Sequence, residues 1–190
     1  MLQQGKYVAD VLYFIGEDTP KMSGIIDPEL PSGYSYDYIN AEAIIKRLSV
    51  KNGYFVLPDG MKYKILAIPQ DANIRPETLQ KLSDLVKQGG SILGNKFKKS
   101  PSLQNFPACD FEIKKLSQEL WGGEIYTGEL KRKVGKGYVF DGMGIQNALD
   151  FLNIEKDVKI EKDIPVLWTH RSFCLLYTSD AADERSSVDL

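Results

Sequence analysis

The sequence has little of what metal sites, disulfide frameworks and membrane spans require. Its 190 residues include two cysteines, Cys109 and Cys174, and one histidine, His170. This set offers no metal-ligand spacing, no disulfide framework and little material for a catalytic triad. No apolar run reaches about 18 residues, and no GxGxxG, Walker or GxSxG motif occurs, so we expect no membrane span, cofactor or metal in this chain.

The composition that is present favours one globular domain. Hydrophobic residues make up 43% of the chain and charged residues 26%, enough for a core of useful size. The formal net charge is -2 with both signs interspersed, which gives no nucleic-acid footprint. The densest basic run, residues 130–133, is predicted to be a solvated loop rather than a phosphate site. Residues 1–20 lack the pattern of a signal peptide, so no export signal is expected in the chain itself.

Strand and helix patterns alternate along the chain. The apolar run 8–15, ended by Gly16, predicts a strand covered on both faces. An amphipathic helix is predicted from Ala41 to Leu48, and a turn at 58–60 between two β-prone runs. Further strands are predicted at 64–69, 91–94 and 137–140, and further helices from Pro76, from a cap at Asp110, and over 145–152. The alternation predicts an α/β fold, a mostly parallel sheet flanked by helices on both sides.

Chemistry in such a sheet belongs at the carboxyl ends of its strands. Glu17 and Asp18 follow the first predicted strand, and Asp71 follows the strand at 64–69. These carboxylates could form a cluster for acid–base work or for a hard cation. Acids at strand ends also begin loops and cap helices, and we favour this structural interpretation.

Three other groups of side chains have both a functional and a structural interpretation. Cys109, in an expected loop, could be a nucleophile, and His170 could belong to a binding face. Tyr34, Tyr36 and Tyr38 could stack on a sugar, or could anchor on the domain the loop that carries them. We favour the structural interpretation for each, and assign no catalytic, cofactor-binding or metal-binding residue.

Several ordered motifs carry a resemblance to one family. They are LQQGKYVADVLYFIGED, LPSGYSYDYINAEAIIKRLSVKNGYFVLPDGMKYKILAIPQ, LVKQGGSILGNKFKKSPSLQNFP, ELWGG and IPVLWTHRS, which together extend over residues 2–173. The chain resembles glycoside hydrolase family 106, the α-L-rhamnosidase-like proteins. The resemblance implies that residues 1–160 form the flavodoxin-like, class I glutamine-amidotransferase-like α/β domain that follows a catalytic barrel. Residues 161–173 would then be the truncated first strand of the next, β-rich domain.

The resemblance also implies a part without catalytic residues. Active amidotransferases of this architecture carry a cysteine on a strand-to-helix turn, where this chain has Gly94 and Asn95, neither of them a nucleophile. Glycoside hydrolysis needs two carboxyl groups, which in this family belong to a barrel of about 250 residues. We therefore expect a noncatalytic accessory domain, cut from an exported, periplasmic or extracellular α-L-rhamnosidase-type enzyme that acts on rhamnose-containing glycans.

The partner implied by this resemblance is the missing catalytic barrel, on which the domain would pack. Glycan contact is compatible with this role. The alternative is a free-standing sugar-binding module, or a degenerate amidotransferase-like module without a nucleophile. An excised domain would expose the surface that packed on its neighbour.

The last seventeen residues, CLLYTSDAADERSSVDL at 174–190, differ from everything before them. Residues 174–183 can be encoded by TGT CTC TTA TAC ACA TCT GAC GCT GCC GAC, which resembles a transposase-based sequencing adapter. We interpret 174–190 as a non-native, loosely ordered tail on a metagenomic fragment. The tail holds four of the 26 acidic residues and one of the 24 basic ones, so the acidity of the chain belongs to it.

Overall fold

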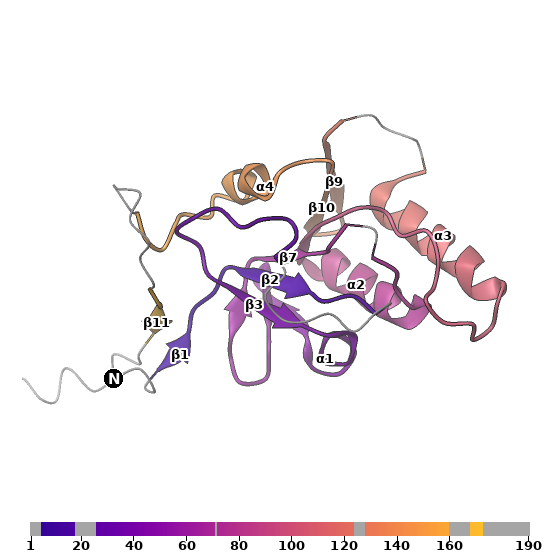
Figure 1. Ribbon diagram of the computed structural model, residues 1–190, viewed down its shortest axis with the longest axis horizontal. Coiled ribbons are helices and arrows are strands. Elements are labelled where there is room, and N and C mark those ends of the chain that lie inside the picture. The colour runs from indigo at the N-terminus through magenta and orange to yellow at the C-terminus, as the bar shows by residue number, and fades with distance from the viewer. Residues whose placement is uncertain (1–4, 18–25, 71, 124–127, 160–167, 173–190) are drawn as a thin grey trace, which may run out of the picture.

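The computed structural model describes residues 5–17, 26–70, 72–123, 128–159 and 168–172. Within these residues a six-stranded sheet carries helices on both faces (Figure 1). The described residues exclude several predicted features, namely Asp18, Asp71, most of segment 161–173 and all of segment 174–190, which we interpret as a non-native tail. No helix in the described ranges is both long and apolar enough to cross a membrane.

The central sheet is mostly parallel, as predicted. Its strand order is β3-β2-β7-β8-β10-β9, and only β9 runs antiparallel to its neighbour. The interior strands β2, β7 and β8 are buried along their whole length, which suits strands covered on both faces. In this order the strands span Tyr36–Ile39, Val11–Phe14, Ile65–Ala67, Ser91–Leu93, Gly137–Asp141 and Leu130–Val134.

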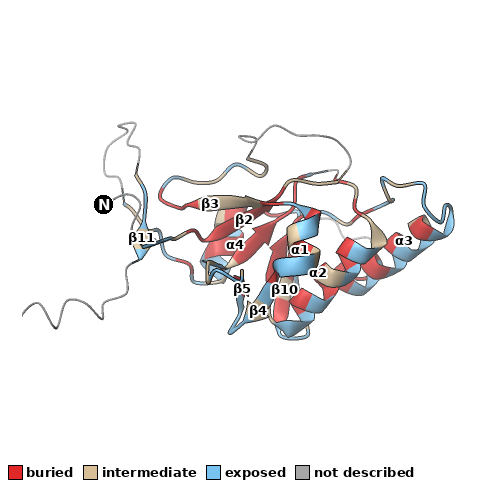
Figure 2. Cartoon of the chain, turned by 90° about the horizontal axis from the view of Figure 1, so that it is seen from below, coloured by how far each residue is buried: buried red, intermediate tan, exposed pale blue. Residues whose placement is uncertain are grey.

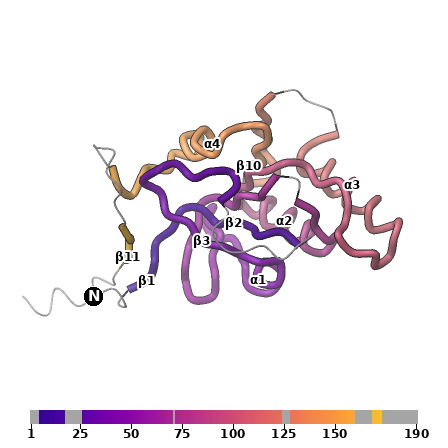
Figure 3. The backbone as a smooth tube through the Cα atoms, viewed as in Figure 1, coloured from indigo at the N-terminus to yellow at the C-terminus, as the bar shows by residue number. Residues whose placement is uncertain are grey.

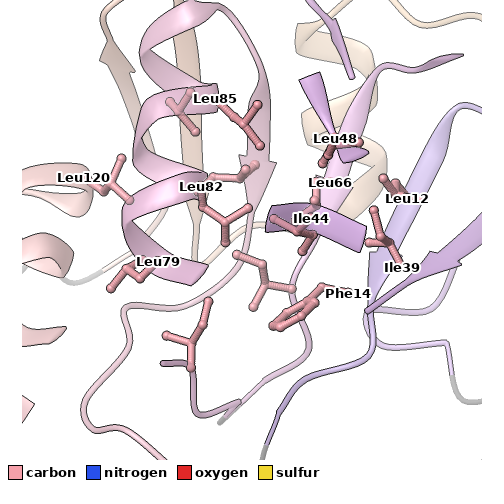
Figure 4. Packing of buried hydrophobic residues seen from close by; sticks show 14 of the residues in the cluster. Leu12, Phe14, Ile39, Ile44, Leu48, Leu66, Leu79, Leu82, Leu85 and Leu120 are labelled. Carbon is pink, nitrogen blue, oxygen red and sulfur yellow. The ribbon is translucent and has the colours of Figure 1, made fainter. Parts of the chain in front are cut away.

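Four helices cover the two faces of this sheet unequally. They are α1 (Ala41–Arg47), α2 (Pro76–Gln88), α3 (Ala108–Trp121) and α4 (Ile145–Phe151). The larger core joins one face of the sheet to α1, α2 and α3, with Ile44, Leu82 and Leu120 all fully buried (Figure 4). The smaller core joins the other face to α4 through Ala148 and Leu149. In Figure 2 the interior strands of the central sheet are largely red, while α2 and α3 alternate between buried and exposed residues, as amphipathic surface helices do.

Two small antiparallel sheets lie beside the central one. The first has three strands, β4 (Ser49–Lys51), β5 (Tyr54–Val56) and β6 (Lys62–Tyr63), and its β5–β6 turn contains the predicted breakers at 58–60. The second pairs β1 (Lys6–Tyr7) with β11 (Arg171–Ser172). This pairing brings the two ends of the described chain side by side, at the end of the molecule opposite α3 (Figure 3).

Two segments predicted to be loops are strands instead. Residues 36–39 form β3, so the period of two in the tyrosines is that of a strand at the edge of the sheet. The basic run at 130–133 lies in β9, the opposite edge strand. Leu130 and Val134 pack against the core while the three basic residues between them are exposed, a pattern that also discourages pairing with another chain.

The start of α3 differs from the prediction as well. The residue in the cap position is Pro107, and Asp110 lies inside the first turn. The Asp110 carboxylate accepts a hydrogen bond from the backbone N–H of Ser100 at 2.8 Å, so it fixes the preceding loop rather than the helix end. Cys109, expected in a loop, is buried in the same helical turn.

Candidate functional site

The carboxyl ends of β2, β7 and β8 meet at one edge of the central sheet, where the fold places chemistry if it has any. Glu17 follows β2, and the Gly94–Asn95 turn follows β8. A cavity of about 300 Å³ lies at this edge. Its lining consists of Pro69, Ala72, Asn73, Asn95, Lys96, Phe97, Lys98 and Lys99.

The Glu17 side chain binds residues at the start of α2. Its carboxylate accepts hydrogen bonds from the backbone N–H of Arg75 at 2.8 Å, from Arg75 Nε at 2.6 Å and from the Thr78 hydroxyl at 3.2 Å. Arg75 occupies the cap position of α2 and makes no side-chain cap bond, and Glu17, from another element, accepts the backbone N–H of this cap residue instead. A carboxylate is also favourable at this helix end because of the helix dipole. The hydrogen bond that the Arg75 guanidinium donates to Glu17 raises the pKa of Arg75.

Gly94, the first residue of the turn after β8, has no room for a side chain. Gly94 has φ of +156°, and a Cβ placed there would lie 2.5 Å from the Ile68 Cβ and 3.0 Å from the Ile68 carbonyl oxygen. Hydrogen bonds fix the turn in this position. The Gly94 N–H donates to the Phe140 carbonyl at 3.0 Å, and the Trp121 indole N–H donates to the Gly94 carbonyl at 2.8 Å. Packing and hydrogen bonding therefore exclude a side chain at this position.

The described lining of the cavity beside this turn lacks the pair of carboxyl groups that glycoside hydrolysis needs. Among the described residues the lining has amide and lysine side chains but no carboxylate, and Lys96 donates to the Gly122 carbonyl at 2.7 Å. Of the three predicted acids, Glu17 is bound by residues at the start of α2, and Asp18 and Asp71 lie outside the described residues. No three His, Cys, Asp or Glu side chains come together as metal ligands within the part of the chain that the structure describes.

The three tyrosines pack on the domain. Tyr34 is buried, and its hydroxyl donates to the Ile154 carbonyl at 3.1 Å. Tyr36 meets both Tyr13 and Tyr38 edge to face, at centroid distances of 5.6 and 5.4 Å. These contacts anchor the segment as predicted, although Tyr36 and Tyr38 lie in the edge strand β3 and only Tyr34 lies in the preceding loop.

Cys109 and His170, the two remaining candidates, lie at opposite ends of the molecule and do not form a pair. The Cys109 thiol is buried against the Ser102 carbonyl at 3.8 Å. The His170 side chain is 45% exposed, and its Nδ1 lies 3.1 Å from an oxygen of Asp157. Each side chain therefore has a local contact, which agrees with the structural interpretation of both.

A second polar cluster, at the amino ends of the strands, is absent from the sequence prediction. Asp10, directly before β2, is 5% exposed, and Lys64, directly before β7, lies 3.4 Å from one of its carboxylate oxygens. Asp157 and His170 lie in the same hollow, which measures about 650 Å³. One carboxylate oxygen of Asp10 and one of Asp157 are buried and accept no hydrogen bond from the described residues. Burial raises the pKa of Asp10, opposed by Lys64 and reinforced by Asp157.

A signal for this cluster exists in the sequence. Asp10 is the one charged residue in the apolar run 8–15. Acidic residues are rarely buried in strands unless they are paired. Lys64 and Asp157 could not be assigned to it from sequence, because only the fold brings positions 10, 64 and 157 together.

Comparisons with known proteins agree on the relatives of this chain. A family model described as alpha-L-rhamnosidase matches residues 1–187. A curated protein of Formosa agariphila with the provisional name beta-glucuronidase is 42% identical over 163 residues, which are 86% of this chain and 13% of that protein. The solved structure of a rhamnosidase from Novosphingobium sp. PP1Y matches with a TM-score of 0.75 and 29% identity, over 90% of this chain and 16% of that one. The chain thus spans less than a fifth of the length of either relative.

Proposed function

The chain belongs to glycoside hydrolase family 106, the α-L-rhamnosidases, and from that membership we propose that it is a noncatalytic accessory domain of a longer rhamnosidase-type enzyme. The enzyme would act on rhamnose-containing glycans, and the domain would support its catalytic part. The small share of each relative that the chain covers supports this role, because a glycosidase barrel alone needs about 250 residues.

The main support for the proposal is that Gly94 and Glu17, at the carboxyl edge of the sheet, are held by packing and by hydrogen bonds. Gly94 cannot hold a side chain without displacing Ile68, and Glu17 is bound by Arg75 and Thr78. Glycoside hydrolysis needs two carboxyl groups on either side of a sugar bond. The cavity at this edge offers none among the described residues that line it.

The tyrosine packing counts against the alternative of a free-standing sugar-binding module. A ring that stacks on a sugar needs an open face, whereas Tyr34 is buried and Tyr36 is half-buried with edge-to-face contacts to two other rings. Isothermal titration of the chain with L-rhamnose tests this alternative. We expect no heat of binding, and saturable binding with one site per chain would favour the module.

The accessory role is tested by thermal unfolding of the domain alone and joined to the rest of its enzyme. A domain that packs on a neighbour gains stability from that interface, so we expect a higher unfolding midpoint in the joined form. Equal midpoints in the two forms would contradict a packed accessory domain.

A further inference from the structure

The loop before α3 presents large apolar side chains to solvent. We propose that Leu103, Phe106 and Phe111, here called the apolar tip, form the surface by which this domain docks on the remainder of its own longer polypeptide. The inference rests on the accessory role proposed above and assigns that role to particular side chains. The tip lies at the end of α3, far from the β1–β11 pair (Figures 1 and 3).

The tip concentrates the exposed apolar side chains of the domain. Leu103, Phe106 and Phe111 are 84%, 62% and 67% exposed, whereas the other two exposed large hydrophobic residues, Tyr54 and Phe151, are 37% and 41% exposed. Three such side chains within nine residues form a local concentration that isolated soluble domains rarely leave uncovered.

The composition around the tip resembles that of a protein interface, with an uncharged centre and a charged rim. Segment 101–107, PSLQNFP, contains no charged residue in a chain of which 26% is charged. Exposed charges flank it on both sides, at Lys98 and Lys99 before it and at Glu112 and Lys114 after it. Interfaces commonly have a charge-depleted, aromatic-rich centre inside a polar rim.

The loop is braced, so its apolar side chains point outward from a fixed backbone. The Ser102 N–H donates to the Ser100 hydroxyl at 3.2 Å, and the Gln104 N–H donates to the Ser102 hydroxyl at 3.1 Å. The Asp110 carboxylate holds Ser100 at the base of the loop. A surface that is already ordered loses less conformational entropy on docking, which favours this loop over an irregular one.

A local role does not account for this exposure. Phe106 and Phe111 occupy the positions before the cap and at the fourth residue of α3, where side chains can pack on each other and fix the entry of the helix. Each ring nevertheless stays more than half exposed, and Leu103 takes no part in that pair. The Lys114 ammonium lies 5.9 Å from the centre of the Phe111 ring and covers it only in part.

The small share of each relative that this chain covers indicates what docks on the apolar tip. In the Novosphingobium rhamnosidase 84% of the chain lies outside the matched region, and in the Formosa protein 87% does. A domain carried in so large a polypeptide has the rest of that chain available at high effective concentration, so an apolar surface would meet it before any separate partner.

The test uses the triple variant Leu103→Ser/Phe106→Ser/Phe111→Ser in two settings, the isolated chain and the full-length enzyme that contains it. Exposed side chains contribute little to the isolated fold, so its unfolding midpoint should change little. In the full-length enzyme the domain transition should fall toward that of the isolated chain, because the interface is lost. Tyr54→Ser, an exposed aromatic residue far from the tip, is the control and should change neither midpoint.

Two results would overturn the tip as the docking surface. One is an equal shift of the midpoint in both settings, which would make these residues part of the domain's own stability. The other is an unchanged full-length transition. If wild type is still more stable when joined than when isolated, the accessory role stands and only the surface is wrong. If wild type gains nothing from being joined, the accessory role itself fails.

Discussion

The two ends of the central sheet use their acids differently. At the carboxyl edge, Glu17 accepts three hydrogen bonds and caps α2. At the amino edge, Asp10 is equally buried, yet one of its oxygens accepts no bond from the described residues and burial raises its pKa. At the carboxyl edge, which carries chemistry in related architectures, the described acid Glu17 serves the fold, and the acid with an unsatisfied oxygen lies at the amino edge.

The largest expected effect comes from adding a side chain at the carboxyl edge. Gly94→Ala forces a Cβ into Ile68 at a backbone conformation that suits glycine, and should lower the free energy of unfolding by about 3 kcal/mol. Urea unfolding of the variant measures this loss. Gly123→Ala is the matched control, because a Cβ there meets nothing within 4 Å. If the two variants were equally stable, position 94 would have room for a side chain, which would contradict the account.

Removing Glu17 should have the next largest effect. Glu17→Ala leaves the first turn of α2 without its acceptor and the Arg75 guanidinium without its buried partner, at a cost of about 2 kcal/mol. Chemical denaturation again gives the value. The control is Glu42→Ala, which removes an exposed ion pair with Lys46 and should change stability little. A Glu17 variant as stable as wild type would restore this acid as a candidate functional group.

The smallest effect concerns the amino edge and depends on pH. Because burial raises the pKa of Asp10 above 3.8, the folded state binds its proton more tightly than the unfolded state does. The resulting stabilisation is present below pH 3.8 and is lost as the pH rises through the folded pKa. Asp10→Asn cannot titrate, so its stability relative to wild type should increase as the pH rises through this window.

Lys64, Asp157 and His170 face the same hollow, so their charges belong in the interpretation of that pH profile. Glu42 gives the opposite sign as a control, because the hydrogen bond from Lys46 lowers its pKa. Glu42→Gln should therefore lose stability relative to wild type above its pKa, and the difference should shrink as the pH falls. If the stability difference between Asp10→Asn and wild type did not change with pH, burial would not raise the pKa of Asp10.

The parts of the fold that follow a strong period were predictable. The apolar run at 8–15 contains β2, and Pro76 and Gly89 mark the start and the end of α2. The edge strands were not predictable as strands, because β9 is basic along its exposed positions and β3 was hidden in a loop-like context. The pattern of an edge strand depends on one partner only, so little of its sequence is constrained.

The candidate site was predictable by residue type but not by partner. Sequence reasoning favoured a structural role for Glu17, but the donors that occupy it lie at positions 75 and 78. The block at Gly94 likewise depends on Ile68, a residue of the neighbouring strand end. Such pairings are set by sheet order and register, which local patterns do not specify.

The most direct test of the central claim is turnover of an aryl α-L-rhamnoside by the purified chain. The account predicts no release of the aryl group above the buffer rate, for wild type and for Glu17→Gln alike, because no pair of free carboxyl groups faces a cavity among the described residues at the carboxyl edge. Turnover by wild type that Glu17→Gln abolishes would contradict it, and would place catalysis within this domain.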